Sequence, residues 1–181
     1  LSARKPVIYA GGGAIASNAE RELFELNEIL DAPVTNTLMG LGIYPATNDR
    51  FLGMLGMHGT YQANMAMHNA DLIIAIGARF DDRITNNPSK FSPEAKVIHL
   101  DVDHSSVSKI IEANIAVFGQ VKNSLQAMIE LLKQNIDKYT KYSIIYLFPI
   151  YTYIYSFYKK AWILSLNSSI FAIKSVKLKK A

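Results

Sequence analysis

The stretch PVIYAGGGAIASNAERELFELNEIL (residues 6–30) decides the expected fold. Its apolar beginning predicts a short strand over residues 7–9, and three consecutive glycines follow. Ser17 and Glu20 have the S-x-x-E spacing of a helix capping box. Apolar residues at 19, 23, 26 and 30 then predict one buried helix face. A strand, a glycine turn and a helix in this order favour an α/β domain.

The sequence repeats this alternation as far as residue 133. Further strands are predicted over residues 33–36, 51–55, 71–76, 97–102 and 116–118, and further helices over 60–69, 105–111 and from 121 onward. The segment 71–76 (DLIIAI) is apolar almost throughout, as in strands buried on both faces of a parallel sheet. The pattern predicts a doubly wound, mostly parallel six-stranded sheet with helices on both faces, a Rossmann-like or DHS-like NAD/FAD-binding domain.

Composition divides the chain into two parts, a domain over residues 1–133 and an atypical C-terminal tail over residues 134–181. The first part holds 11 Lys and Arg against 14 Asp and Glu, whereas the tail holds eight Lys and one Asp. Because the excess positive charge belongs to the tail, it does not support a nucleic-acid-binding face on the domain. The absence of a charged-then-apolar leader favours a soluble compartment or a removed N-terminus.

The tail has an unusual composition that leaves three interpretations open. It contains no glycine but 11 of the 19 aromatic residues of the chain, and no regular period persists through it. It could be translated non-coding or frame-shifted DNA, a membrane segment, or an additional domain. The membrane interpretation is less favoured than translation of non-coding or frame-shifted DNA. The uncharged run of residues 142–158 is short for a membrane span, and Pro149 interrupts it.

No metal site is predicted. The chain has no cysteine, which excludes disulfides and thiolate ligands. The four histidines show no metal-ligand spacing. His58 is expected in a ligand-lining loop, His68 and His104 are expected to cap or decorate helices, and His99 is expected in the core or sheet.

Candidate ligand-binding residues follow the predicted strands, because ligands of doubly wound sheets bind at the carboxyl ends of the strands. Residues 11–16 fit G-x-G-x-x-A, a turn that lets a pyrophosphate approach the backbone, although such a turn can also be purely structural. The second strand ends in Asn36 and Thr37, without the acidic residue of a plain NAD fingerprint. Arg79 follows the fourth strand and is suited to bind a phosphate, and Asp101 ends the fifth and is suited to ribose hydroxyls.

Residues 4–133 resemble the central domain of the acetohydroxyacid synthase (acetolactate synthase) catalytic large subunits, which are thiamine diphosphate enzymes. The resemblance is carried by TLMGLGIYP (residues 37–45), GMLGMHGTYQANMAMHNADLIIAIGARFDDRITN (residues 53–86) and IHLDVD (residues 98–103). The second stretch is long, and it separates this family from relatives such as pyruvate oxidase and glyoxylate carboligase.

The resemblance implies that the domain binds FAD in an extended pose, with a structural rather than a redox role. The implied cofactor contacts are Gly11, Gly12, Gly13, Thr37, Leu38, Leu55, Gly56, Met57, His58, Gly77, Ala78, Arg79, Asp81, Asp101, Val102, Gln120 and Val121. The implied substrate-channel residues are Met57, His58, Asp82 and Arg83. The sequence departs from the family at Gln120, where the turn usually carries an acidic residue as G-D-V.

The family also implies an activity for the full-length subunit. Two pyruvates give 2-acetolactate and CO₂, or pyruvate reacts with 2-oxobutyrate, in the biosynthesis of the branched-chain amino acids valine and isoleucine. The resemblance implies that a glutamate of an N-terminal domain activates thiamine diphosphate, and that a G-D-G…N motif of a C-terminal domain holds its diphosphate and Mg²⁺. It also implies a homodimer or tetramer with a regulatory small subunit, in the cytoplasm or in plastids.

We expect this chain alone to have no turnover, since it contains neither the activating glutamate domain nor a G-D-G motif. An alternative is a stand-alone flavin- or nucleotide-binding module of similar fold. A third hypothesis, a membrane-tethered interaction protein, depends on the tail.

Overall fold

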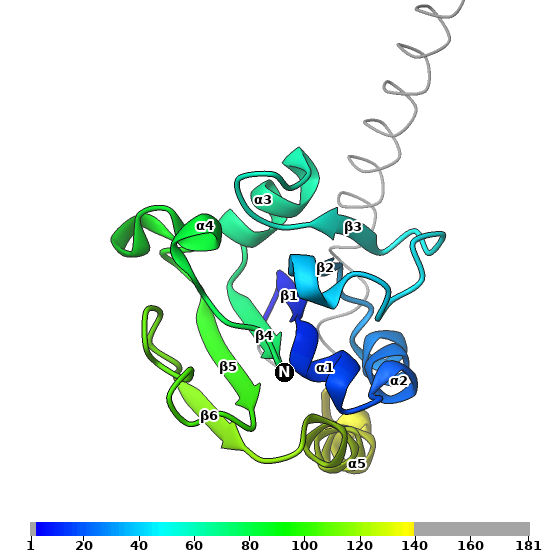
Figure 1. The fold of residues 1–181 in the computed structure, drawn as a ribbon. Coiled ribbons are helices and arrows are strands. Elements are labelled where there is room, and N and C mark those ends of the chain that lie inside the picture. Colours follow the sequence, from blue (N-terminus) through cyan, green and yellow to red (C-terminus); the bar gives the residue numbers. More distant parts are fainter. Residues whose placement is uncertain (1–2, 140–181) are drawn as a thin grey trace, which may run out of the picture. The chain divides into compact units, whose positions relative to one another are not determined.

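The structure is a computed structural model that describes residues 3–139, and Figure 1 shows the arrangement of their elements. Among these residues six parallel strands form one sheet in the order β3-β2-β1-β4-β5-β6. The strands are β1 (Pro6–Ala10), β2 (Val34–Asn36), β3 (Phe51–Met54), β4 (Leu72–Ile76), β5 (Lys96–Asp101) and β6 (Ile115–Phe118). The α-helices are α1 (Gly12–Ala16), α2 (Glu20–Leu30), α3 (Tyr61–His68), α4 (Asp82–Thr85) and α5 (Val121–Tyr139), and the 3₁₀ helices are η1 (Leu38–Gly40) and η2 (Pro88–Lys90).

The centre of the sheet is the pair formed by β1 and β4. The two strands pair along their whole length, from Pro6 opposite Leu72 to Ala10 opposite Ile76. The strand order reverses between them, because β2 and β3 follow on one side and β5 and β6 on the other. In doubly wound domains ligands bind at this reversal, outside the carboxyl ends of the strands.

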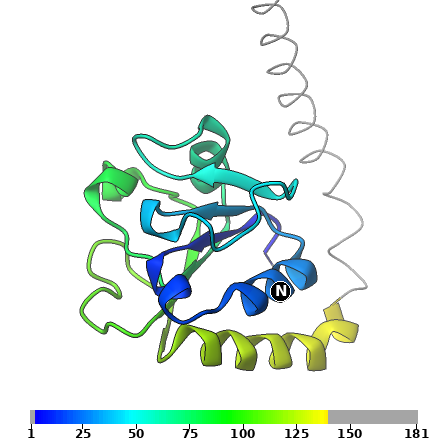
Figure 2. The ribbon, with the colours of Figure 1, turned by 45° about the vertical axis from the view of Figure 1, so that its right-hand side comes forward.

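Helices cover both faces of the sheet, so the predicted doubly wound fold is confirmed. On one face α2 and α5 lie side by side (Figure 2), and Leu23, Leu26 and Leu125 are fully buried there. The opposite face is covered by α3 and by the segment that carries α4 and η2, with Met67 and Phe80 in a second core. A fully buried side chain of this size stabilises the fold by about 1.5–3 kcal/mol.

The predicted capping box at Ser17 and Glu20 is wrong. α1 ends at Ala16, Asn18 adopts a left-handed backbone with φ 48°, and α2 begins at Glu20 without a side-chain cap. The Ser17 hydroxyl donates to Gln120 Oε1 at 3.5 Å instead. Asparagine tolerates the left-handed region better than most residues, so the chain breaks between the two helices at this point.

The predicted helix over residues 105–111 is also wrong, because the segment folds into turns. The Asp103 carboxylate accepts hydrogen bonds from the Ser105 N–H at 2.9 Å and from the hydroxyls of Ser105 and Ser106 at 2.7 and 2.6 Å. Such local bonds compete with helix formation. His104, which we expected on a helix, instead stacks on Phe118 with the ring centroids 4.0 Å apart.

The boundary between domain and tail stays a prediction. Residues 1–137 form one compact unit that contains the whole sheet, and α5 continues to Tyr139. The three interpretations of the tail depend mainly on residues 140–181, which lie outside the described residues. No helix between residues 3 and 139 combines the length and the apolar character that a membrane span needs.

Candidate functional site

The loops that follow β1, β2 and β4 meet at the reversal of the strand order. The Gly11 N–H donates to the Ile76 carbonyl at 3.0 Å, and the Gly13 N–H donates to the Gly77 carbonyl at 2.9 Å. On the other side, the Thr37 N–H donates to the Ala10 carbonyl at 2.9 Å. One continuous edge is therefore formed by the predicted glycine turn (residues 11–13), Thr37 and Gly77. We call this edge, together with the loops that follow the other strands, the rim.

The three glycines of the turn have different roles. A Cβ on Gly11 would lie 2.2 Å from the Gly77 oxygen, and a Cβ on Gly13 would lie 2.8 Å from the Gly77 Cα. Both glycines are therefore required by the close approach of two backbones, which is the structural interpretation of the turn. A Cβ on Gly12 would meet only the Met39 side chain and backbone, at 3.1 Å and beyond. Gly12 is therefore the least tightly packed of the three glycines.

The loop after β3 brings the predicted substrate-channel residues together. The Met57 N–H donates to the Arg83 carbonyl at 3.0 Å, which joins this loop to α4 beside Asp82. The side chains of Met57, His58, Asp82 and Arg83 are all exposed, and that of Met57 is 70% exposed. Leu55 is 2% exposed and belongs to the core, so its side chain supports the loop from below.

The loop after β4 is fixed by Tyr9, a residue that the sequence analysis did not single out. The Tyr9 hydroxyl donates to the Arg79 carbonyl at 3.2 Å. Burial, and to a smaller extent the negative charge of Asp81, raises the pKa of Tyr9, so the phenol stays a donor at neutral pH. The Arg79 side chain is exposed, whereas Ala78 is buried. Arg79 is thus presented to solvent from a rigidly held backbone.

Arg79 faces the loop that follows β5. Hydrogen bonds from Ser106 and Ser105 hold the pKa of Asp103 near 2, and the positive charge of Arg79 contributes to this shift. Asp103 therefore carries a full negative charge at neutral pH, opposite the cation that is predicted to bind a phosphate. No ion pair between Arg79 and Asp103 forms within 4.0 Å, which leaves the guanidinium available.

Asp101, the predicted ribose contact, is partly engaged within the protein. Its side chain is 10% exposed; Oδ1 accepts from the Asp103 N–H at 2.9 Å, and Oδ2 lies 3.9 Å from His99 Nε2. Burial lowers the pKa of His99, and the Asp101 charge opposes this effect only in part. His99 is therefore a buried neutral core residue, as the sequence predicted, and Val102 beside it is 57% exposed.

The loop after β6 completes the rim. The Gly119 N–H donates to the Asp101 carbonyl at 3.1 Å, and Gln120 is exposed. Val121 is only 1% exposed and packs in the core, so it can reach a ligand only through its backbone. Next to this loop the stacked rings of His104 and Phe118 form an exposed aromatic pair, which no motif in the sequence signals.

Two buried polar atoms on the rim lack a hydrogen-bond partner among the described residues. They are Asn36 Oδ1 and Thr37 Oγ1, at the end of β2 and next to the glycine turn. Burying a polar group without a partner costs about 1–3 kcal/mol, so a ligand that supplies the missing bonds is favoured. Exposed apolar side chains lie beside them, with Leu38 67% and Met39 74% exposed. The rim therefore offers both unpaired polar atoms and exposed apolar side chains to a ligand.

One hollow of the domain lies away from the glycine turn. This hollow of about 250 Å³ lies between α3 and η2, and among the predicted cofactor residues it is lined only by Leu55. Among residues 3–139, no cluster of three or more His, Cys, Asp or Glu side chains could hold a metal ion. The candidate site therefore consists of the loops along the carboxyl edge of the sheet.

The fold defines a doubly wound, Rossmann-like α/β domain, with the candidate loops at the carboxyl edge of its sheet. Comparison with known proteins narrows this class, because residues 1–128 match the family model of the thiamine pyrophosphate enzyme central domain. The chain belongs to the thiamine pyrophosphate enzyme family.

Similar proteins include acetolactate synthase large subunits. That of Buchnera aphidicola subsp. Acyrthosiphon pisum is 58% identical over 134 residues, and the isozyme 3 large subunit of Escherichia coli K12 is 54% identical over 134 residues. The probable large subunit of Methanocaldococcus jannaschii is 47% identical over 128 residues. These alignments cover 74%, 74% and 71% of this chain and 24%, 23% and 22% of the relatives. The chain thus spans about a quarter of the length of these relatives.

Proposed function

We propose that this chain carries the FAD-binding central domain of an acetolactate synthase large subunit. The similarity to acetolactate synthases supports the enzyme assignment. The single observation that supports a cofactor at the rim is the pair of unpartnered buried atoms, Asn36 Oδ1 and Thr37 Oγ1, beside the glycine turn. The predicted residues follow all six strands along one edge of the sheet, so an extended ligand would contact most of them at once.

The residues of the rim have distinct tasks in this proposal. Gly12 lets the phosphate and ribose portion approach the backbone, and Arg79 pairs with the negative charge of the diphosphate. Asp101 and the backbone near Gln120 hold the adenosine end. Met57 and His58 border the flavin and, together with Asp82 and Arg83, the substrate channel.

The reaction belongs to the complete subunit rather than to this domain. When bound there, thiamine diphosphate supplies the carbanion chemistry that joins two pyruvates. The role of the residues in this chain is to order FAD and to shape one wall of the channel. Association with the remaining domains of the subunit, a dimer or tetramer, a regulatory small subunit and a cytoplasmic or plastid location are further parts of the proposal.

Titration of the 181-residue chain with FAD tests the proposal. We expect flavin fluorescence to change on binding, and Arg79→Ala to raise the Kd about 10- to 150-fold, because a hydrogen bond to a charged group contributes about 1.5–3 kcal/mol. The matched control is Arg4→Ala, which removes an exposed arginine just before β1, at the opposite end of this strand from the glycine turn. The control should bind like the unaltered chain.

Equal affinity of Arg79→Ala and the unaltered chain would remove Arg79 from the site. Absence of FAD binding, with tight binding of another nucleotide such as NAD or ADP, would favour the alternative of a stand-alone nucleotide-binding module.

A further inference from the structure

We propose that Tyr44, Asn27 and Arg50 are positioning residues that fasten the connection between β2 and β3 and so hold Thr37 and Leu38 at the rim. The inference rests on the proposed function, because Thr37 and Leu38 matter only if a ligand binds there. No motif of the family resemblance includes Asn27 or Arg50.

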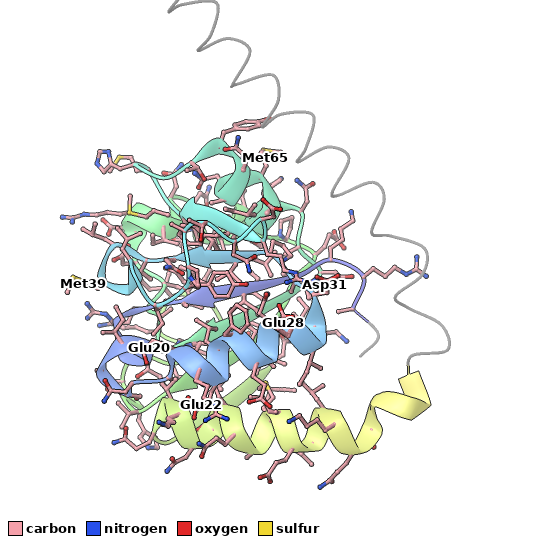
Figure 3. The ribbon with its side chains drawn as sticks, turned by 90° about the vertical axis from the view of Figure 1, so that its right-hand side faces the viewer. Glu20, Glu22, Glu28, Asp31, Met39 and Met65 are labelled. Carbon is pink, nitrogen blue, oxygen red and sulfur yellow. The ribbon has the colours of Figure 1, made fainter. Side chains whose placement is uncertain are left out.

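The connection needs such fastening because it lacks the usual helix. Parallel strands are normally joined by a crossover that packs an α-helix on the sheet, but residues 37–50 contain only the short η1. Met39 is 74% and Leu41 46% exposed, so these side chains contribute little packing. Figure 3 shows Met39 projecting at one end of the domain. Glu28 and Asp31 lie away from it, towards the C-terminal end of α2.

The first fastening point is a buried hydrogen-bond network. The Tyr44 hydroxyl donates to Asn27 Oδ1 at 2.6 Å, and Asn27 Nδ2 donates to the Ala32 carbonyl. Tyr44 and Asn27 are only 2% and 0% exposed. The Tyr44 ring lies 5.9 Å from that of Phe24 and 6.3 Å from that of Phe51. A fully paired buried network of this kind specifies one arrangement of the chain.

The second fastening point lies at the end of the connection. Arg50 Nη1 donates to Glu28 Oε1 at 2.7 Å, and Arg50 Nε donates to Asp31 Oδ1. Asp31 ends α2 in a left-handed conformation with φ 49°. The cation is thus held between two carboxylates of one helix terminus, directly before β3 begins at Phe51.

A third contact ties the beginning of the connection to the sheet. Asn36 Nδ2 donates to the Gly40 carbonyl at 2.9 Å, and a Cβ on Gly40 would lie 2.4 Å from the Ala10 carbonyl oxygen. These contacts hold η1 against the sheet, and Tyr44 and Arg50 hold residues 44–50, which lead to β3. The exposed residues 41 and 42 between them therefore have little freedom to move. Loss of the hydrogen bond between Tyr44 and Asn27 would make residues 44–50, and with them residues 41 and 42, more mobile.

The test compares Tyr44→Phe with Ser92→Ala in the 181-residue chain. Tyr44→Phe removes only the hydroxyl, and we expect amide hydrogen exchange in residues 38–49 to become at least about tenfold faster and the Kd for FAD to rise about three- to tenfold. Ser92→Ala also removes a buried hydroxyl that bonds a carbonyl, that of Met67 at 2.7 Å, on the opposite face of the sheet. It should change neither quantity, even though it also destabilises the fold.

Each outcome decides between the alternatives. Unchanged exchange in residues 38–49, unchanged FAD affinity, or an equal loss of affinity in Ser92→Ala would overturn the proposal. If the unaltered chain does not bind FAD, the proposed function fails, and exchange alone then decides whether these residues fasten the connection: faster exchange in Tyr44→Phe supports it and unchanged exchange overturns it.

Discussion

At the residue scale, His99 is a source of pH dependence at the centre of the domain. Its ring is fully buried between Phe80, at 5.5 Å between centroids, and the Asp101 carboxylate. Burial lowers its pKa below the usual 6.5. The unfolded chain therefore binds more protons than the folded chain once the pH falls below about 6.5, and protonation favours unfolding.

We expect the free energy of unfolding to decrease between pH 7.5 and pH 5.5, and His99→Gln to flatten this dependence. Urea denaturation at several pH values measures both slopes. Other shifted groups act elsewhere, since the lowered pKa values of Glu25 and Asp103 affect stability only below about pH 4.5. An unchanged slope in the variant would show that His99 does not titrate on unfolding.

Single residues also show where sequence reasoning stops. The pattern of glycines predicts a turn at residues 11–13, and the structure confirms it. Which glycine serves the fold and which faces a ligand depends on Gly77, which is distant in sequence and packs against Gly11 and Gly13. The burial of Val121 is likewise a consequence of helix packing that the G-x-V pattern cannot show.

At the scale of elements, the periodic segments were predictable and the segments governed by local side-chain bonds were not. The apolar face of α5 is confirmed, with Val121 and Leu125 buried and Met128 and Leu132 packed against the core. The segment around residue 105 resembled a helix, but the Asp103 carboxylate closed a turn instead. The spacing of apolar residues indicates which side of a helix faces the core. The turn depends instead on whether the Ser105 and Ser106 groups bond the Asp103 carboxylate.

The face of α5 gives an element-scale prediction. Leu125→Ala should lower the free energy of unfolding by about 2–5 kcal/mol, because it opens a cavity beneath a fully buried side chain. Leu131→Ala on the same helix removes a side chain that is 61% exposed, so its effect should stay within about 0.5 kcal/mol. Equal effects in urea denaturation would mean that α5 does not dock as described.

At the scale of the whole molecule, the parallel sheet places the ends of distant segments on one edge. The six strands, the order reversal between β1 and β4 and the helices on both faces follow from alternating apolar segments, so the architecture was predictable. The exposed pair of His104 and Phe118 was not, because it requires β6 to lie beside the turn after β5.

The same architecture explains why the chain alone should be inactive. The rim offers binding groups, but in the family the groups that activate thiamine diphosphate belong to other domains. Positioning of reactants can contribute about 7–11 kcal/mol to lowering a barrier, and we expect this contribution to require the domains that the resemblance implies. Acetolactate formation by the purified chain with thiamine diphosphate, Mg²⁺ and pyruvate would contradict this.

In the proposed function, loops from one edge of the sheet converge on FAD. Amide chemical shifts of the ¹⁵N-labelled chain, recorded during titration with FAD, test it most directly. We predict that the perturbed amides include Gly12, Thr37, Arg79 and Val102 and that the opposite edge, represented by Lys96, stays unchanged. Saturable shifts confined to the opposite edge, or no shifts at millimolar FAD, would contradict the account.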